Sequence, residues 1–169
     1  MNPLKASEGS GVSDDEVAAT VDHVAIDRLQ RAYADLVNRR AWDELAGVFD
    51  PDISITLDLV SRPTVELVGV QEFASFIGPA MERFGFFEFV ILNSYIDLWP
   101  GGERSAATAR VFMCELRTEV GQTQRSDAFG LYRDRYRKTY DGWRIAERRY
   151  QSLAHFPAGD WHPLPSMDD

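Results

Sequence analysis

Two long alternating segments joined by a turn constrain the fold of this chain more than any other feature. Between Ser126 and Ala154, aromatic and aliphatic residues alternate with charged ones on both sides of Tyr140-Asp141-Gly142. This period of two is typical of strands with one apolar and one polar face. Asp-Gly is a favoured hairpin dipeptide, because glycine adopts a positive φ without steric cost. The sequence therefore predicts a long β-hairpin with one face toward a core.

The composition suits one domain and argues against nucleic-acid binding. The chain has 169 residues, of which 44% are hydrophobic and 27% charged, and a formal net charge of −9. These values are typical of a single compact domain. Arginines do cluster between residues 125 and 149, but they alternate with Asp127, Asp134 and Glu147. We therefore expect an ion-paired outer sheet face rather than a nucleic-acid surface.

Targeting and metal signals are weak throughout the sequence. No apolar run is long enough to span a membrane, and the N-terminus lacks the apolar core of a signal peptide. We therefore expect no membrane partner and a cytoplasmic location. Cys114 is the single cysteine, which excludes an intramolecular disulfide, and His23, His155 and His162 show no metal-ligand spacing. We expect neither a metal nor a cofactor.

Hydrophobic periodicity predicts an α+β domain in the order α-α-β-β-α-β-β-β-β. Ser13 to Glu16 matches a capping box before an amphipathic helix whose apolar stripe includes Val17, Val21 and Val24. Further helices are expected at 42–49 and 70–84, and strands at 53–57, 65–68, 86–99, 106–118, 123–138 and 143–153. We expect a flexible tail over 1–15, a folded domain over 16–155, and a C-terminal tail over 156–169 that packs on its own or a neighbouring subunit.

This order resembles the SnoaL-like branch of the nuclear transport factor 2-like superfamily over about residues 24–154. The landmarks are Tyr33, the Arg40–Leu45 step, the Phe49–Asp52 lead into the first strand, Gly69 and the closing hairpin. The resemblance implies a cone, in which a curved antiparallel sheet wraps around three helices and leaves an apolar central pocket, as in scytalone dehydratase, ketosteroid isomerase and bile-acid dehydratase folds. It also implies a hydrophobic small-molecule ligand and a homodimer or homotrimer.

The chain departs from its catalytic relatives at two positions. Dehydratase and isomerase members typically pair a carboxylate at the end of the first helix with a histidine on the first long strand, because proton abstraction and loss of water need an acid and a base. The corresponding residues here are Asn38 and Phe89, and Phe89 begins the stretch that ends at Asn93. Neither Asn38 nor Phe89 can take up a proton at physiological pH.

Three residues are the candidates for catalysis: Tyr33, Asn38 and Asp127. Asp127 shares a strand face with Arg125 and Phe129. If that face is interior, Asp127 is a buried acid with a raised pKa, and the alternative is an ordinary ion pair with Arg125. Strand alternation places Phe112 and Cys114 on one face, with Cys114 expected as a small buried hydrophobe. The ligand-binding candidates are Trp42, Phe87, Phe89, Ile91, Asn93, Phe112, Cys114, Phe129 and Tyr150.

These observations leave functions from different classes open. One is an enzyme that dehydrates, hydrates or isomerises a polycyclic or aromatic molecule without a cofactor. Another is a non-catalytic ligand-binding or interaction module that has lost the acid/base pair, and a third is the small subunit of a ring-hydroxylating oxygenase. Asp127 or Asp35 projecting into a deep pocket, within hydrogen-bond reach of Tyr33, would favour the enzyme. A pocket filled by Phe87, Phe89 and Phe112 with no buried carboxylate would exclude it.

Overall fold

The structure, a computed structural model, describes residues 11–59 and 62–163, apart from the side chains of residues 160 and 161. The predicted order of helices and strands is confirmed. Of the two predicted tails, residues 1–10 and 164–169 lie outside the described residues. The elements are α1 (Asp14–Arg39), the 3-10 helix η1 (Trp42–Gly47), β1 (Phe49–Asp58), β2 (Val65–Val68), α2 (Val70–Glu82), β3 (Phe84–Leu98), the 3-10 turn η2 (Pro100–Gly102), β4 (Ala106–Glu119), β5 (Arg125–Thr139), β6 (Gly142–Phe156) and β7 (Asp160–Trp161).

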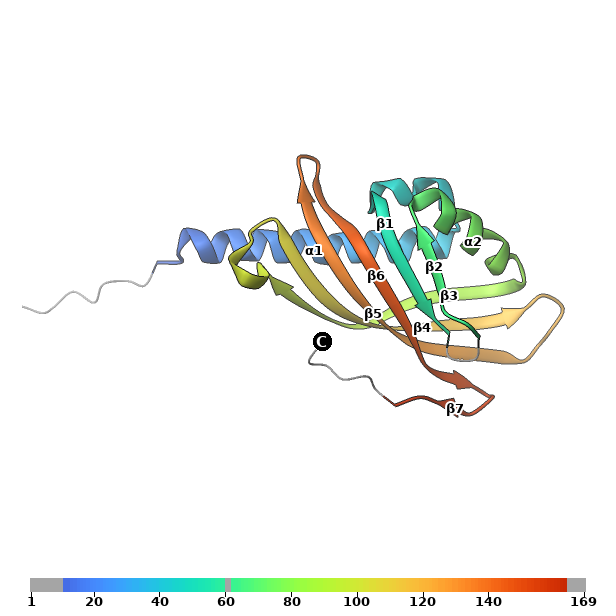
Figure 1. Cartoon of the computed structure of the whole chain (residues 1–169). Helices are drawn as coiled ribbons and strands as arrows, with labels where there is room; N and C mark the ends of the chain where they lie inside the picture. The colour runs from blue at the N-terminus through green and yellow to red at the C-terminus, as the bar shows by residue number, and fades with distance from the viewer. Residues whose placement is uncertain (1–10, 60–61, 164–169) are drawn as a thin grey trace, which may run out of the picture.

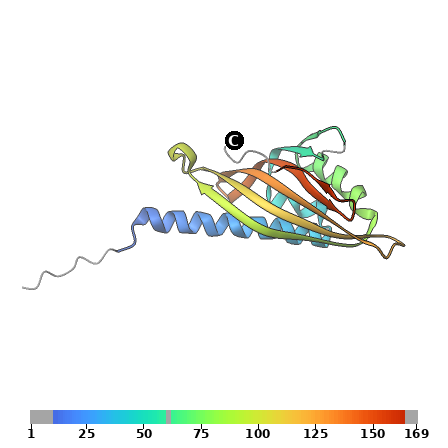
Figure 2. The same ribbon diagram turned by 90° about the horizontal axis from the view of Figure 1, so that it is seen from below.

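One curved sheet wraps around α1, as Figure 1 and the view from below in Figure 2 show. Its strand order is β2-β1-β6-β5-β4-β3, and β7 pairs with β6 off this path. The β3 to β6 strands are joined in sequence and pair antiparallel. However, β1 pairs parallel with β6, so the expected antiparallel sheet is in fact mixed. Tight hairpins impose antiparallel pairing only on consecutive strands, and β1 and β6 are far apart in the chain.

The first helix begins as predicted but buries a different face. Ser13 and Glu16 form the expected capping box, with Ser13 N donating to the Glu16 carboxylate at 2.8 Å. The N-terminal turns of α1 project beyond the sheet (Figures 1 and 2). Val17, Val21 and Val24 are exposed rather than buried, because α1 turns the face of Asp22 and Ile26 toward the rest of the protein. The buried residues of α1 are Asp22, Ile26, Gln30, Tyr33, Leu36 and Val37.

Asn38 joins the end of α1 to the edge strand β3. Its Nδ2 donates to the carbonyl oxygen of Phe89 at 3.0 Å, and the Phe89 N–H donates to its Oδ1 at 2.6 Å. An amide supplies both a donor and an acceptor, whereas an ionised carboxylate only accepts. Asn38 therefore has a structural contact that an aspartate could not reproduce.

A bulge in β3 reverses part of the predicted alternation. Ile91 pairs with Met113, but Asn93 pairs with Phe112, so Leu92 is an extra residue in β3. One extra residue moves the following side chains to the opposite face. As a result Ser94 donates a hydrogen bond inward to Gln30 of α1 at 2.7 Å, while Asn93 is exposed.

Asp22 of α1 is a buried carboxylate that links the helix to the sheet, at the end of the cone away from Asn38. Its oxygens accept hydrogen bonds from Lys138 Nζ at 2.6 Å, Trp143 Nε1 at 3.0 Å and Trp99 Nε1 at 3.2 Å. Burial alone would raise the pKa of Asp22, but these hydrogen bonds and the charge of Lys138 together lower it below its ordinary value. A lowered pKa stabilises the fold above the pKa of the unfolded chain, and this stabilisation is lost as pH falls through the folded-state pKa.

We expect Asp22→Asn to lower the free energy of unfolding by about 1 to 3 kcal/mol at pH 7, because three hydrogen bonds to a charged group are weakened. Urea denaturation measures this loss. The difference from wild type should shrink below about pH 4, where the carboxylate of the unfolded chain is protonated. Asp43→Asn, at an exposed position in η1, is the control. A difference that is the same at pH 3 and pH 7 would contradict this role for Asp22.

Candidate active site

A cavity of about 340 Å³ lies at the end of the cone where α1 ends. It is enclosed by α2 and by the ends of β1, β3, β4, β5 and β6 that gather there. The apolar part of its lining consists of Val37, Leu57, Leu59, Phe73, Phe76, Ile77, Ala80, Met81, Phe84, Phe87, Phe89 and Ala128. The polar and charged part consists of Tyr33, Arg62, Arg83, Glu115, Arg117, Tyr132, Arg148, Tyr150 and His155. The cavity thus combines apolar walls with several groups that can donate hydrogen bonds.

Arg148 of β6 is buried in the wall of this cavity. Its side chain is 2% exposed, and its Nε and Nη2 donate to the two oxygens of Asp134 at 2.8 and 2.6 Å. Burial alone would lower the pKa of Arg148, but the charge and hydrogen bonds of Asp134 raise it well above its usual value. Arg148 and Asp134 therefore form a buried, charged pair, whereas Asp134 was expected on the outer face.

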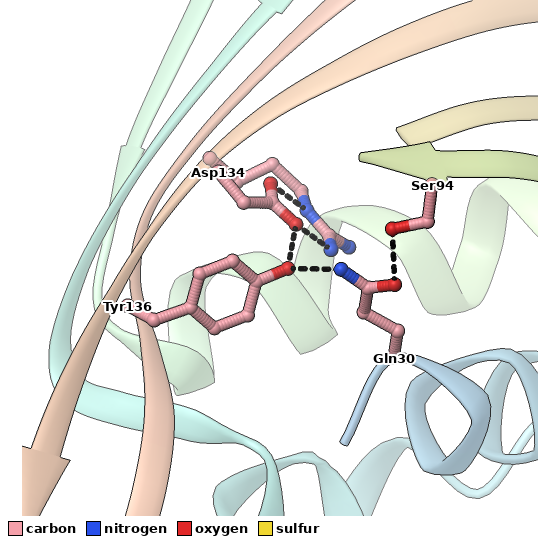
Figure 3. A network of polar contacts seen from close by, with 5 residues as sticks. Gln30, Ser94, Asp134 and Tyr136 are labelled. Atoms are coloured by element: carbon pink, nitrogen blue, oxygen red, sulfur yellow. Dashed lines mark hydrogen bonds and ion pairs between the residues drawn. The ribbon is translucent and has the colours of Figure 1, made fainter. Parts of the chain in front are cut away.

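The carboxylate of Asp134 is the centre of a network that crosses from the sheet to the helix (Figure 3). The Tyr136 hydroxyl donates to Asp134 at 2.9 Å, Gln30 Nε2 donates to that hydroxyl at 3.0 Å, and Ser94 donates to Gln30 Oε1 at 2.7 Å. The chain of contacts orients each member, since every hydrogen bond fixes the next. Residues of β5, α1 and β3 together therefore fix the position of Arg148.

The guanidinium of Arg148 lies between two tyrosine rings. Its Cζ atom is 4.1 Å from the ring centroids of both Tyr33 and Tyr132, which is a close cation–π geometry. The third nitrogen, Nη1, is buried and has no hydrogen-bond partner among the described residues. Because Nε and Nη2 face Asp134, Nη1 is the donor left for the cavity that Arg148 lines.

Glu115 of β4 brings a carboxylate to the same cavity. It pairs across the sheet with Phe89 and Ala128, which also line the cavity. Its side chain is 20% exposed, and Oε2 lies 3.3 Å from Arg117 Nη1. Burial raises the pKa of Glu115, although the charges of Arg117 and Arg83 partly oppose the shift. A carboxyl with a raised pKa in an apolar cavity can serve as a general base or acid.

Three tyrosines complete the polar lining. Burial raises the pKa of Tyr33, Tyr132 and Tyr150, and the charge of Glu115 raises all three further. These phenols are therefore neutral hydrogen-bond donors over the physiological range. The ring of Tyr150 packs directly over Gly130, where a Cβ atom would overlap the ring. Gly130 thus allows the close approach that sets the position of Tyr150.

The structure brings four of the predicted site residues to the cavity: Tyr33, Phe87, Phe89 and Tyr150. The other predicted residues lie elsewhere. Asn38 is hydrogen-bonded to the Phe89 backbone, and Trp42 and Ile91 pack against the hydrophobic core. The bulge of β3 moves Asn93 outward.

Four predicted residues of β5 and β4 do not line the cavity. Asp127 pairs with Arg125 at 2.7 and 3.1 Å, which is the alternative left open above. Its neighbour on that face, Phe129, packs edge-on against Phe156 rather than in the cavity. Phe112 and Cys114 lie on the face of β4 opposite Met113 and Glu115, because successive strand residues point in opposite directions.

Sequence reasoning missed Glu115, Tyr132 and Arg148. The apolar character of Phe112 and Cys114 favours their face of β4 as the interior one, but Glu115 on the opposite face lines the cavity. Arg148 was hidden among the arginines expected on the outer face, although strand alternation places it on the same face as Tyr150, two residues away. Sequential pairing of β3 with β4, anchored at Phe89, was the signal that could have located Glu115.

The described residues hold neither a metal-binding cluster nor a helix suited to a membrane. Across 11–59 and 62–163, no three His, Cys, Asp or Glu side chains are grouped so that they could hold a metal ion. In the same ranges, no helix combines the length and the apolar character that crossing a membrane requires.

Comparison with known proteins identifies the fold and the family. No curated protein sequence matches the chain. A candidate scytalone dehydratase from Novosphingobium aromaticivorans DSM 12444 is 18% identical, with a TM-score of 0.72 over 88% of this chain and 93% of that one. Kfla4162 protein from Kribbella flavida is 17% identical, with a TM-score of 0.69 over 83% and 96%. Hexachlorocyclohexane dehydrochlorinase LinA-type3 from Novosphingobium barchaimii LL02 is 14% identical, with a TM-score of 0.70 over 89% and 99%. The model of the SnoaL-like domain matches residues 18–149, and the chain therefore belongs to the SnoaL-like family.

Proposed function

We propose that this chain binds a flat hydrophobic small molecule in the cavity and catalyses a cofactor-independent isomerisation or dehydration, with Glu115 as the general base. The observation that carries the proposal is the partly buried carboxyl of Glu115, whose pKa is raised, in a cavity that also holds apolar side chains and neutral tyrosines. The names of two structural neighbours, a dehydratase and a dehydrochlorinase, are consistent with elimination chemistry on this fold.

The reaction begins with transfer of a proton from carbon to Glu115. The carboxylate of Glu115 removes a proton next to a carbonyl group, and the electron pair of the C–H bond moves toward the carbonyl oxygen to form an enolate. Neutral tyrosine hydroxyls donate hydrogen bonds to that oxygen, and such donors stabilise the charge that develops in the transition state. The protonated Glu115 then returns the proton to another carbon, which gives an isomer, or to a departing β-hydroxyl, which leaves as water.

Binding without turnover is the second candidate function. The contact between Glu115 and Arg117 favours it, because an ion pair stabilises the ionised carboxylate and weakens its basicity. Asn38 and Phe89 also stand where catalytic relatives were expected to have an acid/base pair. The homodimer or homotrimer and the cytoplasmic location stay predictions.

Hydrogen–deuterium exchange tests the proposal without knowledge of the natural substrate. The probes are 2-tetralone and androst-5-ene-3,17-dione, two flat ketones with acidic C–H groups. We expect both to raise the melting temperature, since a ligand of the folded state stabilises it. In D2O, NMR should show faster loss of the α-proton signal with the protein than with buffer. A thermal shift without accelerated exchange would favour binding alone, and no shift with either ketone would contradict the cavity's role.

A further inference from the structure

The charge of the cavity differs in sign from that of the chain. The whole chain carries a formal net charge of −9, yet four arginines line the cavity and Glu115 is the one carboxylate among its described lining residues. Asp134 offsets Arg148 and Glu115 offsets Arg117, so Arg62 and Arg83 leave two positive charges in excess. A cleft with one sign of charge raises the local concentration of ligands of the opposite sign.

Two of these arginines present buried donors without partners. Among the described residues, neither Nη1 of Arg148 nor Nε of Arg117 has a hydrogen-bond acceptor, and both residues line the cavity. The Arg148 side chain is 2% exposed. A buried donor left without an acceptor costs free energy, and an acceptor on a ligand removes that cost. The donors are therefore suited to an oxygen that the ligand supplies.

We propose that the ligand is a flat hydrophobic carboxylate whose carboxylate group binds Arg148 Nη1 and Arg117 Nε. This inference rests on the proposed function and names its substrate class. The acceptor is a charge present in the ground state of the ligand, distinct from the enolate oxygen that the tyrosines face. A single negative charge fits better than the double charge of a phosphate monoester, because burying a second charge beside Glu115 adds desolvation and repulsion.

A pair of ligands of similar shape, one charged and one neutral, tests this class. We expect 2-naphthoate to bind about tenfold more tightly than 2-naphthamide in calorimetry at pH 7 and low salt, because its charge adds an attraction to the arginines that the neutral amide lacks. The preference should fall as salt is raised, because the exposed Arg62 and Arg83 contribute screened interactions. Equal or tighter binding of the amide would overturn the proposal, as would tighter binding of 2-naphthyl phosphate.

Variants assign the preference to named residues. Arg117→Met should bring the two affinities within about twofold, because the charged ligand loses more than the neutral amide when the guanidinium is removed. Arg148→Met should also reduce the preference for 2-naphthoate, provided that urea denaturation shows this variant to be folded. If it is not folded, the result with Arg117→Met alone tests the assignment. Arg135→Met is the control, since Arg135 is 73% exposed beside Glu147 and does not line this cavity. A preference retained in Arg117→Met would overturn the assignment.

The outcomes also separate this proposal from the proposed function. If 2-tetralone raises the melting temperature but 2-naphthoate binds no better than its amide, the carboxylate class is wrong and the cavity's binding role stands. If neither the naphthyl ligands nor the ketones bind, both proposals fail.

Discussion

Glu115→Gln is expected to slow the exchange of the 2-tetralone α-proton roughly 10²- to 10⁴-fold, the range that a positioned general base contributes. Glutamine keeps the shape of the side chain but cannot accept the proton. The thermal shift with 2-tetralone should therefore persist while exchange falls to the rate in buffer. NMR in D2O measures the exchange, and the melting curve measures binding in the same samples.

The pH dependence of the wild-type protein checks the same role. Because burial raises the pKa of Glu115, the exchange rate should increase with pH through an inflection above the ordinary range of glutamate, and Glu115→Gln should lack that inflection. Glu88→Gln is the matched control, since Glu88 is an exposed glutamate on the adjacent strand β3. An unchanged exchange rate in Glu115→Gln would exclude Glu115 as the base.

Asp134→Asn is expected to lower the free energy of unfolding by about 3 to 5 kcal/mol, because it leaves the charge of Arg148 buried without a counter-charge. Urea denaturation measures this change, and the dependence on urea concentration should stay that of the wild type if the change is confined to stability. The exposed pair of Arg31 and Asp27, at 2.7 Å, is the control. Asp27→Asn should have little effect, because solvent screens that pair.

A double variant separates the cost of breaking the pair from the value of having it. Asp134→Leu combined with Arg148→Met replaces both charges by apolar side chains, and such replacements are often neutral or stabilising by about 1 to 4 kcal/mol. We expect it to be more stable than Asp134→Asn and to lose the preference for 2-naphthoate. If the double variant is as unstable as Asp134→Asn, the loss in the free energy of unfolding comes from the disrupted hydrogen-bond network rather than from the unpaired charge of Arg148.

Local patterns in the sequence predicted the elements well and their faces less well. The Asp141-Gly142 turn and the Ser13 capping box depend on neighbouring residues alone, and both are where the pattern placed them. The directions of the β3 side chains depend on one extra residue, Leu92. The hydrophobic pattern of the sequence does not reveal this extra residue. The buried face of α1 could not be predicted for a different reason. Asp22 and Gln30 are buried because they form hydrogen bonds with residues more than 60 positions away in the chain.

The cavity could be predicted in part for the same physical reason. Phe87, Phe89 and Tyr150 are apolar or aromatic and follow the expected alternation, so their inward direction could be inferred. Glu115 and Arg148 are charged, and charged residues on strands usually face solvent. Charged partners stabilise their inward direction: Asp134 of β5 for Arg148, and Arg117 of the same strand for Glu115.

The amide of Asn38 also protects an edge of the sheet. An edge strand presents unpaired N–H and C=O groups that can recruit a strand from another molecule. At Phe89, the side chain of Asn38 takes up one such pair as a neighbouring strand would. A carboxylate at this helix end would repel the Phe89 carbonyl and free this part of the edge. In this chain, an acid at residue 38 would therefore expose part of the β3 edge to pairing with a strand of another molecule.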